Sequence, residues 1–260
     1  MRTLFFLFMG IVCVVGTSAI PFDKTDLFLK KHGFVEIKQS KTGLDHDFYI
    51  LSYEISNEDY RKFLYDLKIH NRTEELQVAA VDTARWDSLY GSANAYTNFY
   101  FQNEVYNNYP VVNISHAGAA LYCKWLTEKY TEAGYAVEVR LPDSVEWKLA
   151  AQGGDTSAVY GWGKGGYVDR KGYYKCNAKK GTVCDYTLSP VLSFDTNPYG
   201  MFNMSGNAAE MLSEPGKHKG GSWESLEPAL RIHGADPYNG ITHGSPFIGF
   251  RPVVILKTAN

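Results

Sequence analysis

The alternation of apolar and polar residues predicts two short strands near the start of the globular region. Residues 33–39 (GFVEIKQ) and 45–56 (DHDFYILSYEIS) alternate and are rich in aromatic and β-branched side chains, as half-buried strands are. A helical period then follows, because Tyr60, Phe63 and Leu64 recur at spacings of three and four along NEDYRKFLYDL. The pattern therefore predicts a pair of strands followed by an amphipathic helix.

Capping residues mark the starts of three predicted helices. Ser56 precedes the helix just described, and Ser115 precedes a helical pattern that runs to residue 130. Asp143 and Glu146 have the Asp-x-x-Glu spacing of a capping box, in which each side chain bonds the backbone N–H of the other residue. Gly153 is expected to end that short helix. The remaining apolar runs predict short strands at 110–115 and 137–142.

Two long parts of the chain show neither the alternation of a strand nor the spacing of an amphipathic helix. Residues 68–109 are polar and rich in Tyr and Asn, which predicts a long ordered excursion, and residues 154–260 are mostly Gly-, Tyr- and Asn-rich loops. The chain has 260 residues, with 19 Tyr, 14 Phe, 5 Trp and 24 Gly, so we expect a loop-rich fold held by aromatic packing. Its net charge of −2 and the absence of a basic block argue against a nucleic-acid partner.

The first 19 residues are typical of an export signal. Arg2 precedes an apolar run from Leu4 to Val15, and small residues around Ala19 form a cleavage site. Because the run is too short for a comfortable membrane span, we expect a mature chain without one, in the periplasm, in the cell envelope or secreted. An uncleaved anchor is the alternative. Lipidation at Cys13 is less favoured, because the preceding residues lack the usual small side chains.

Three cysteines lie beyond the predicted signal. Cys123 is on the apolar face of the helix AALYCKWLTEKY, which predicts a buried thiol. Cys176 and Cys184 flank a polar loop, CNAKKGTVC, and their spacing fits no zinc pattern. In an oxidising compartment these two residues could pair, which would stabilise the fold by about 2.5 kcal/mol in the chain-entropy description.

Seven segments occur in an order that resembles the formylglycine-generating enzyme, or sulfatase-modifying factor, family. They are YEISNEDYRKFL, YPVVNISHAGAALYCKWL, RLPDSVEWKLAAQGG, YGWG, SPVLSFDTNPYGMFNMSGNAAEML, KGGSW and IGFRPV. The resemblance covers residues 34–254. It implies a single irregular α+β domain related to C-type lectins, between a lead-in at 20–33 and a tail at 255–260.

The resemblance also implies a structural calcium ion around residues 203–210. Side-chain oxygens of Asn203 and Glu210 and backbone carbonyls of Gly206 and Ala208 would bind it, and these are the ligands that calcium prefers. The alternative is a turn in which Asn203 and Glu210 only bond backbone amides. A second calcium site of the family would fall at Asn177, Ala178 and Asp185.

The catalytic residues of the family are not matched. Its two copper-binding cysteines lie three and eight residues beyond the serine of the Gly-Gly-Ser motif, which is Ser222 here. Those positions are Ser225 and Leu230, and no cysteine follows Cys184. Copper(I) requires soft thiolate ligands, so we predict no catalytic residue of this kind and no formylglycine-generating activity.

The sequence therefore predicts a lectin-like scaffold without the chemistry of its family. Residues 81–115 are similar to exported structural lipoproteins of the gliding-motility and type IX secretion machinery of Bacteroidota, although this chain is shorter and lacks a convincing lipidation motif. That likeness implies binding to protein partners in the envelope, for which Tyr and Asn are suitable interface residues. The alternatives are an exported oxidase of different chemistry, acting on a secreted metabolite or protein, and a lectin-like ligand-binding module.

Other polar residues are expected to carry no chemistry. Three histidines of the C-terminal third could form a cluster, but scattered polar residues are the favoured interpretation. Two glutamates beside the position of the missing cysteine could form a carboxylate pair, although solvated loop charges are favoured. These residues are His218, His233 and His243, and Glu224 and Glu227.

Overall fold

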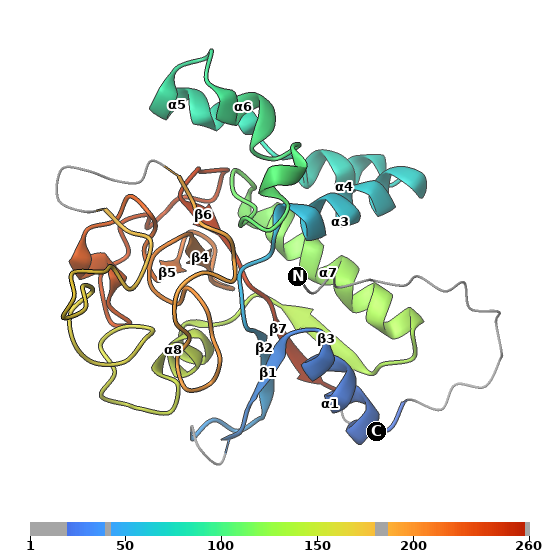
Figure 1. Cartoon of the computed structure of the whole chain (residues 1–260). Coiled ribbons are helices and arrows are strands. Elements are labelled where there is room, and N and C mark those ends of the chain that lie inside the picture. The colour runs from blue at the N-terminus through green and yellow to red at the C-terminus, as the bar shows by residue number, and fades with distance from the viewer. Residues whose placement is uncertain (1–19, 40–42, 180–186, 258–260) are drawn as a thin grey trace.

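A four-stranded antiparallel sheet with helices beside it forms one part of the molecule, and a loop-rich region with a smaller sheet forms the other (Figure 1). The structure is a computed structural model that describes residues 20–39, 43–179 and 187–257. The main helices are α1 (Phe22–Lys31), α3 (Asn57–Ile69), α7 (His116–Glu132) and α8 (Ser144–Gln152). None of the helices in these ranges is long and apolar enough to cross a membrane.

The larger sheet joins distant parts of the chain. Its strands lie in the order β1 (Phe34–Ile37), β2 (Phe48–Leu51), β7 (Val253–Leu256) and β3 (Val137–Arg140). Because the last strand lies between two early ones, the sheet closes only when residues near the end of the chain are in place. The smaller sheet has the order β5 (His218–Lys219), β4 (Ala209–Met211) and β6 (Ile248–Gly249), with β4 and β6 parallel.

The capping residues perform the predicted roles. The Ser56 hydroxyl accepts the N–H of Asp59 at 3.1 Å, and Ser115 caps α7 in the same way. Asp143 and Glu146 form both halves of the capping box of α8, which ends at Gly153 with a φ of 58°. These three helix starts are therefore confirmed.

The strand predicted at 110–115 is wrong. The backbone N–H of Val111 bonds the carbonyl of Ile55, whereas that of Asn113 bonds the carbonyl of Ser245. Because the two bonds go to different segments, no ladder forms, and only an isolated bridge joins Ser56 to Pro110. The strand predicted over 45–56 is also shorter than expected, since β2 covers only four residues.

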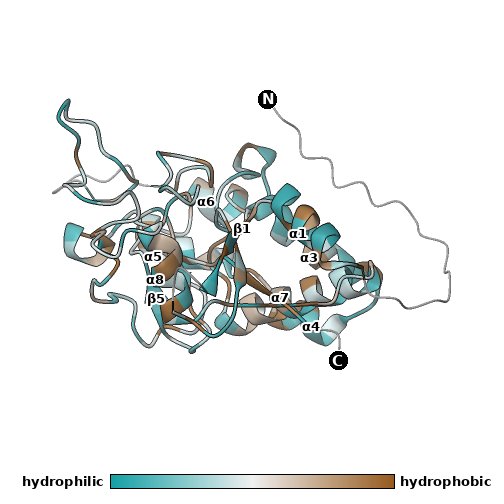
Figure 2. Cartoon of the chain, turned by 90° about the horizontal axis from the view of Figure 1, so that it is seen from below, coloured by the Kyte–Doolittle hydropathy of each residue, from teal (hydrophilic) through white to brown (hydrophobic). Residues whose placement is uncertain are grey.

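Aromatic side chains form the centre of the core, as the composition predicted. The rings of Tyr60 and Tyr122 stack with centroids 5.8 Å apart, and Phe250 packs edge-on against Tyr122 at 5.4 Å. Leu29 of α1 is fully buried in the same cluster, so the lead-in segment packs against the domain. Figure 2 shows the apolar residues gathered on the central strands and along α7.

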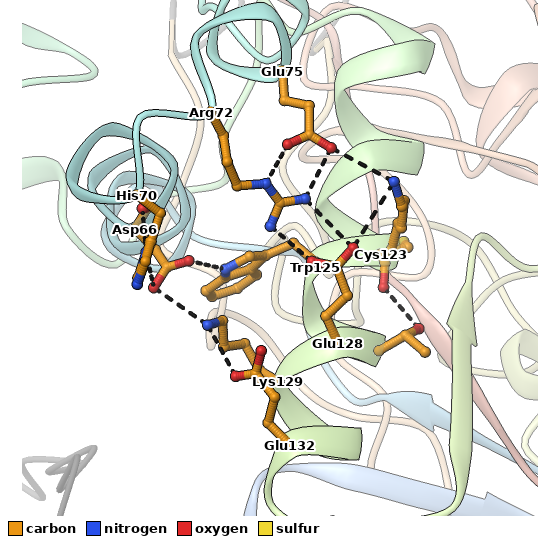
Figure 3. Close-up of polar contacts among 11 residues, drawn as sticks. Asp66, His70, Arg72, Glu75, Cys123, Trp125, Glu128, Lys129 and Glu132 are labelled. Carbon is orange, nitrogen blue, oxygen red and sulfur yellow. Dashed lines mark hydrogen bonds and ion pairs between the residues drawn. The ribbon is translucent and has the colours of Figure 1, made fainter. Parts of the chain in front are cut away.

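A network of ion pairs holds α3, α4 (Thr73–Val78) and α7 together (Figure 3). Arg72 donates to the carboxylates of Glu75 and Glu128, the second at 2.7 Å, and so links the start of α4 to α7. Asp66 of α3 accepts the indole N–H of Trp125 at 2.8 Å. The contacts are partly exposed, so they specify the positions of the helices more than they stabilise the fold.

The Tyr- and Asn-rich excursion is ordered, as predicted, and projects from the body as short helices (Figure 1). Stacked aromatic rings support it, since the ring of Trp86 lies 5.2 Å from that of Tyr96 and 5.1 Å from that of Tyr100. After α4, its elements are η1 (Thr83–Trp86), α5 (Asp87–Tyr90), α6 (Ala95–Phe99) and η2 (Glu104–Tyr106).

Candidate functional site

The segment 203–208 makes a buried, strongly bent turn that leads into β4. Asn203, Gly206 and Asn207 all have positive φ values, of 52°, 84° and 64°. A Cβ atom at Gly206 would overlap the backbone carbonyl oxygen of Asn177. Glycine is therefore required here for the close approach of another backbone segment, in addition to the bend that the sequence predicted.

Glu210 is fully buried and bonds three side-chain N–H groups. Arg251 donates to its two carboxylate oxygens at 2.7 and 2.6 Å, and the indole N–H of Trp147 donates at 2.7 Å. The positively charged guanidinium of Arg251 thus lies where a metal ion would bind this carboxylate. A calcium ion bound at the same place would be repelled by that guanidinium. Glu210 does not fit the predicted role of calcium ligand, and the alternative of bonds to backbone amides does not describe it either.

Asn203 instead bonds a second buried carboxylate, that of Glu54. The Nδ2 group of Asn203 donates to Glu54 Oε2 at 3.0 Å, and that of Asn207 donates to Glu54 Oε1 at 2.9 Å. The same two amides donate to the carbonyls of Val191 and Ser189, at 3.0 and 3.2 Å. Glu54 therefore connects this turn to the 189–191 segment through neutral partners only.

The ionised carboxylate of Glu54 has no cation of its own among the described residues. Burial raises its pKa to about 7; the charge of nearby Arg251 opposes that rise and the charge of Glu210 adds to it. Two buried carboxylates thus share one guanidinium, which is already hydrogen-bonded to Glu210. The sequence interpretation missed Glu54; its only signal was a charged residue at the end of the apolar run FYILSY.

Glu54 is a better candidate for a cation ligand than Glu210, because no cationic side chain among the described residues donates a hydrogen bond to it. Calcium prefers carboxylate, amide and carbonyl oxygens. The amides of Asn203 and Asn207 turn their Nδ2 groups toward Glu54, so their side chains would have to rotate to present oxygen to an ion. Within the described ranges, no three His, Cys, Asp or Glu side chains gather as a metal site. The calcium ion predicted at Asn203, Gly206, Ala208 and Glu210 stays a prediction, and Glu54 is a second carboxylate that could serve as its charged ligand.

In EDTA, the unfolding free energy should fall as the pH rises from about 4.5 to about 7. The folded state holds a proton on Glu54 that the unfolded state, with its ordinary pKa of 4.5, has released. The stabilisation that this proton on Glu54 gives the folded state is fully present below pH 4.5 and amounts to about 3 kcal/mol. Urea unfolding across this range measures it. Glu54→Gln should remove this slope, and the control Glu58→Gln, at a half-exposed position, should keep it. An unchanged slope in Glu54→Gln would contradict the assignment.

The second predicted calcium site and the predicted disulfide are only partly within the described ranges. Asn177 is buried and its Nδ2 group donates to the Thr187 carbonyl at 2.9 Å, and Ala178 is buried beside it. Cys176 is also buried, next to the turn at Gly206. Asp185 and Cys184 lie outside the described residues, so both assignments stay predictions.

The two residues at the positions of the family cysteines make different kinds of contact. Ser225 Oγ accepts the N–H of Ser222 at 2.9 Å and lies 3.2 Å from the Tyr238 hydroxyl, which also bonds the Ser222 hydroxyl. Leu230 is fully buried in an apolar cluster with Tyr160, and its carbonyl accepts the hydroxyl of Ser205. A hydroxyl group and an aliphatic side chain thus stand at the two positions of the family cysteines. The one sulfur side chain of the Leu230 cluster, within the described residues, is that of Cys176.

The other candidate residues are separately paired. His218 is buried, and its backbone N–H and Nδ1 lie 2.8 and 3.3 Å from Asp236 Oδ2, whereas His243 Nδ1 contacts the Gly244 carbonyl. Glu224 pairs with Lys179, and Glu227 contacts Arg231 and Tyr160. The two glutamates are therefore not a carboxylate pair. Both are partly exposed, and each pairs with a separate cation.

A small pocket lies against the turn at Asn203. Trp162, Lys175, Phe194 and Asp195 line it together with Met201, Asn203 and Met204. The indole Nε1 of Trp162 is shielded from solvent and has no hydrogen-bond partner among the described residues. A buried donor without an acceptor costs free energy, so a carbonyl oxygen would be favoured here if the lining of the pocket moved to admit it.

Comparison with known proteins shows the family of this chain. Residues 22–255 match the model of the sulfatase-modifying factor enzyme 1-like domain, which is most of the sequence. The chain belongs to this family. The resemblance seen in the seven sequence segments is thereby confirmed.

The family includes relatives of different activity. The chain is 32% identical over 181 residues to the formylglycine-generating enzyme of Thermomonospora curvata, covering 65% of this chain and 52% of that protein. It is 31% identical over 131 residues to the inactive C-alpha-formylglycine-generating enzyme 2 of Mus musculus, covering 49% of this chain and 39% of that protein. The matched regions thus span about half or less of these relatives.

Solved structures show the same fold. CarF superposes with a TM-score of 0.59 at 18% identity, covering 81% of this chain and 87% of that one. PvdO from Pseudomonas aeruginosa superposes with a TM-score of 0.54 at 16% identity, covering 81% of each chain. The predicted α+β fold of the formylglycine-generating enzyme family is confirmed.

Proposed function

We propose that this member of the sulfatase-modifying factor family has lost formylglycine chemistry and acts by binding protein partners in the cell envelope. The observation that carries the proposal is Leu230. It stands where the second family cysteine is expected and is fully buried against Tyr160 in an apolar cluster. An aliphatic side chain offers no thiolate to copper(I), and the single cysteine of this cluster, Cys176, does not supply the pair that the family uses.

The relatives support the loss of chemistry. The similarity to a mammalian protein named as an inactive formylglycine-generating enzyme indicates that the fold persists without that activity. At the other cysteine position, Ser225 belongs to a hydroxyl network with Ser222 and Tyr238, so it has a structural role of its own. Export, and a place in a gliding or secretion apparatus, are part of the proposal and rest on the sequence resemblance.

The pocket beside Asn203 supports the binding part of the proposal. It offers an unpaired indole N–H at Trp162 and apolar surface from Phe194 and two methionines, with Lys175 and Asp195 also in its lining. The hollow is small, so in this proposal it admits a single carbonyl or side chain of a peptide segment, after the lining has moved to expose the N–H. Calcium near Glu54 and Asn203 would hold one wall of the pocket and has a structural role only in this proposal.

Trp162→Phe should weaken capture of the envelope partner about tenfold, because it removes the unpaired N–H with the five-membered ring and leaves a smaller aromatic ring to stack on Tyr160. The mature chain is cross-linked in its own cells, and the partner is identified and then titrated against the purified protein. Tyr173→Phe, at an exposed tyrosine outside the pocket, is the matched control and should bind normally. Equal affinities for the two variants would contradict the role of the pocket.

A further inference from the structure

Three half-buried tyrosines on the excursion, Tyr96, Tyr106 and Tyr109, form what is called here the tyrosine surface. The ring centroids of Tyr96 and Tyr106 are 6.2 Å apart, and those of Tyr106 and Tyr109 are 5.2 Å apart. Beneath them lie the buried rings of Trp86 and Tyr100, which contact Tyr96 and Tyr106 at 5.2 and 5.1 Å. The surface is therefore fixed by packing and needs little ordering when a ligand binds.

The hydroxyl groups of the tyrosine surface are unpaired and reach solvent. The buried neighbour Tyr100 donates its hydroxyl to the Pro110 carbonyl at 2.8 Å. Across the described residues, the hydroxyls of Tyr96, Tyr106 and Tyr109 have no such partner, and they are not among the shielded unpaired atoms. Burial, together with the nearby hydroxyls of Tyr96 and Tyr109, raises the pKa of Tyr106, which agrees with three phenol groups close together.

The surroundings of the tyrosine surface are almost uncharged. Residues 94–109 contain a single ionisable acid or base other than tyrosine, which is Glu104. The nearby guanidinium of Arg61 is occupied by the Phe101 carbonyl and the Asn107 side chain. Asp87 accepts hydrogen bonds from Asn94 and Thr97, the second at 2.6 Å. The surface therefore has no strong field to attract a highly charged partner.

We propose that the tyrosine surface binds a neutral polysaccharide. A sugar ring has an apolar C–H face that packs on an aromatic ring and a rim of hydroxyl groups that hydrogen-bond, and the three tyrosines offer both features side by side. The low charge fits a neutral glycan, whereas an acidic one would meet Glu104 with no unpaired cation among the described residues 94–109. This role goes beyond the proposed binding of protein partners and uses a different part of the molecule.

The test is retention of the mature chain on immobilised neutral polysaccharides, with glucan, mannan and galactan as probes. The combined variant Tyr96→Phe, Tyr106→Phe and Tyr109→Phe keeps the packed rings and removes the three hydroxyls. Its affinity for the bound polysaccharide should be at least about tenfold weaker. Thermal unfolding of the variant checks that the excursion remains folded.

The control is Tyr65→Phe, which changes an exposed tyrosine on α3 and should leave retention unchanged. The proposal is overturned if none of the three polysaccharides retains the native chain, or if the triple variant is retained as well as the native chain. It is also overturned if the triple variant loses only the envelope protein partner, which would make this surface a protein interface.

Discussion

Glu210→Ala should lower the unfolding free energy by about 3–5 kcal/mol, because it leaves the buried guanidinium of Arg251 without its counter-ion. The indole N–H of Trp147 loses its acceptor at the same time. Urea unfolding of the purified mature chain at pH 7.5 measures the change. The matched control is Glu132→Ala, which removes an exposed carboxylate paired with Lys129 and should cost less than about 1 kcal/mol.

The same variant separates the two assignments of the calcium ligand. If Glu54 and Asn203 hold the ion, added calcium should still raise the midpoint of thermal unfolding in Glu210→Ala, and Glu54→Gln should abolish that response. A calcium response that disappears with Glu210 and persists without Glu54 would restore the original sequence prediction. A cost near 1 kcal/mol for Glu210→Ala would mean that the buried pair with Arg251 is wrong.

Gly206→Ala is expected to be at least as damaging, with a loss of about 3 kcal/mol or more. The residue has a φ of 84°, which alone costs about 1–2 kcal/mol for an L-residue, and the new methyl would overlap the Asn177 carbonyl. Separation of those two backbones would also disturb the pocket next to Asn203. Thermal and urea unfolding of the variant measure the loss.

Gly200→Ala isolates the backbone part of this effect. Gly200 has a similar φ of 78°, but a Cβ there meets nothing within 4 Å. It should therefore cost only about 1–2 kcal/mol. Equal losses for the two variants would show that the contact between Gly206 and Asn177 contributes nothing.

Local features of the fold could be predicted because their causes are local. Ser56, Ser115 and the pair Asp143 and Glu146 bond atoms within three residues of themselves, so their spacing is sufficient evidence. Helix α1 could not be found in this way. It begins after Pro21 without a side-chain cap, and only two of its residues, Thr25 and Leu29, are buried.

The candidate site depended on contacts that no local pattern reveals. Glu54 and Asn203 are 149 residues apart in sequence, and Arg251 reaches Glu210 from the last strand region. The family resemblance placed Asn203, Gly206 and Glu210 in one segment, but it did not indicate which carboxylate keeps an unbalanced charge. Side-chain pairing across the core decides that question, and it follows from the closed fold.

The predicted loss of family chemistry, by contrast, rests on residue identity alone. Ser225 and Leu230 were recognised by counting from Ser222. The structure adds that each of these side chains makes contacts of its own in the fold. A hydroxyl network with Tyr238 occupies the first, and apolar packing against Tyr160 occupies the second. Both positions are integrated into the fold, as expected for a domain retained for binding.

The most direct measurement of the central claim is conversion of a peptide that carries the sulfatase recognition motif. The mature chain is incubated with the peptide, copper, reductant and oxygen, and mass spectrometry looks for the substrate cysteine as an aldehyde. The expected result is no conversion above a control without protein, since Ser225 and Leu230 supply no thiolate pair for copper(I). Conversion well above that control would contradict the claim that this chain has lost the chemistry of its family.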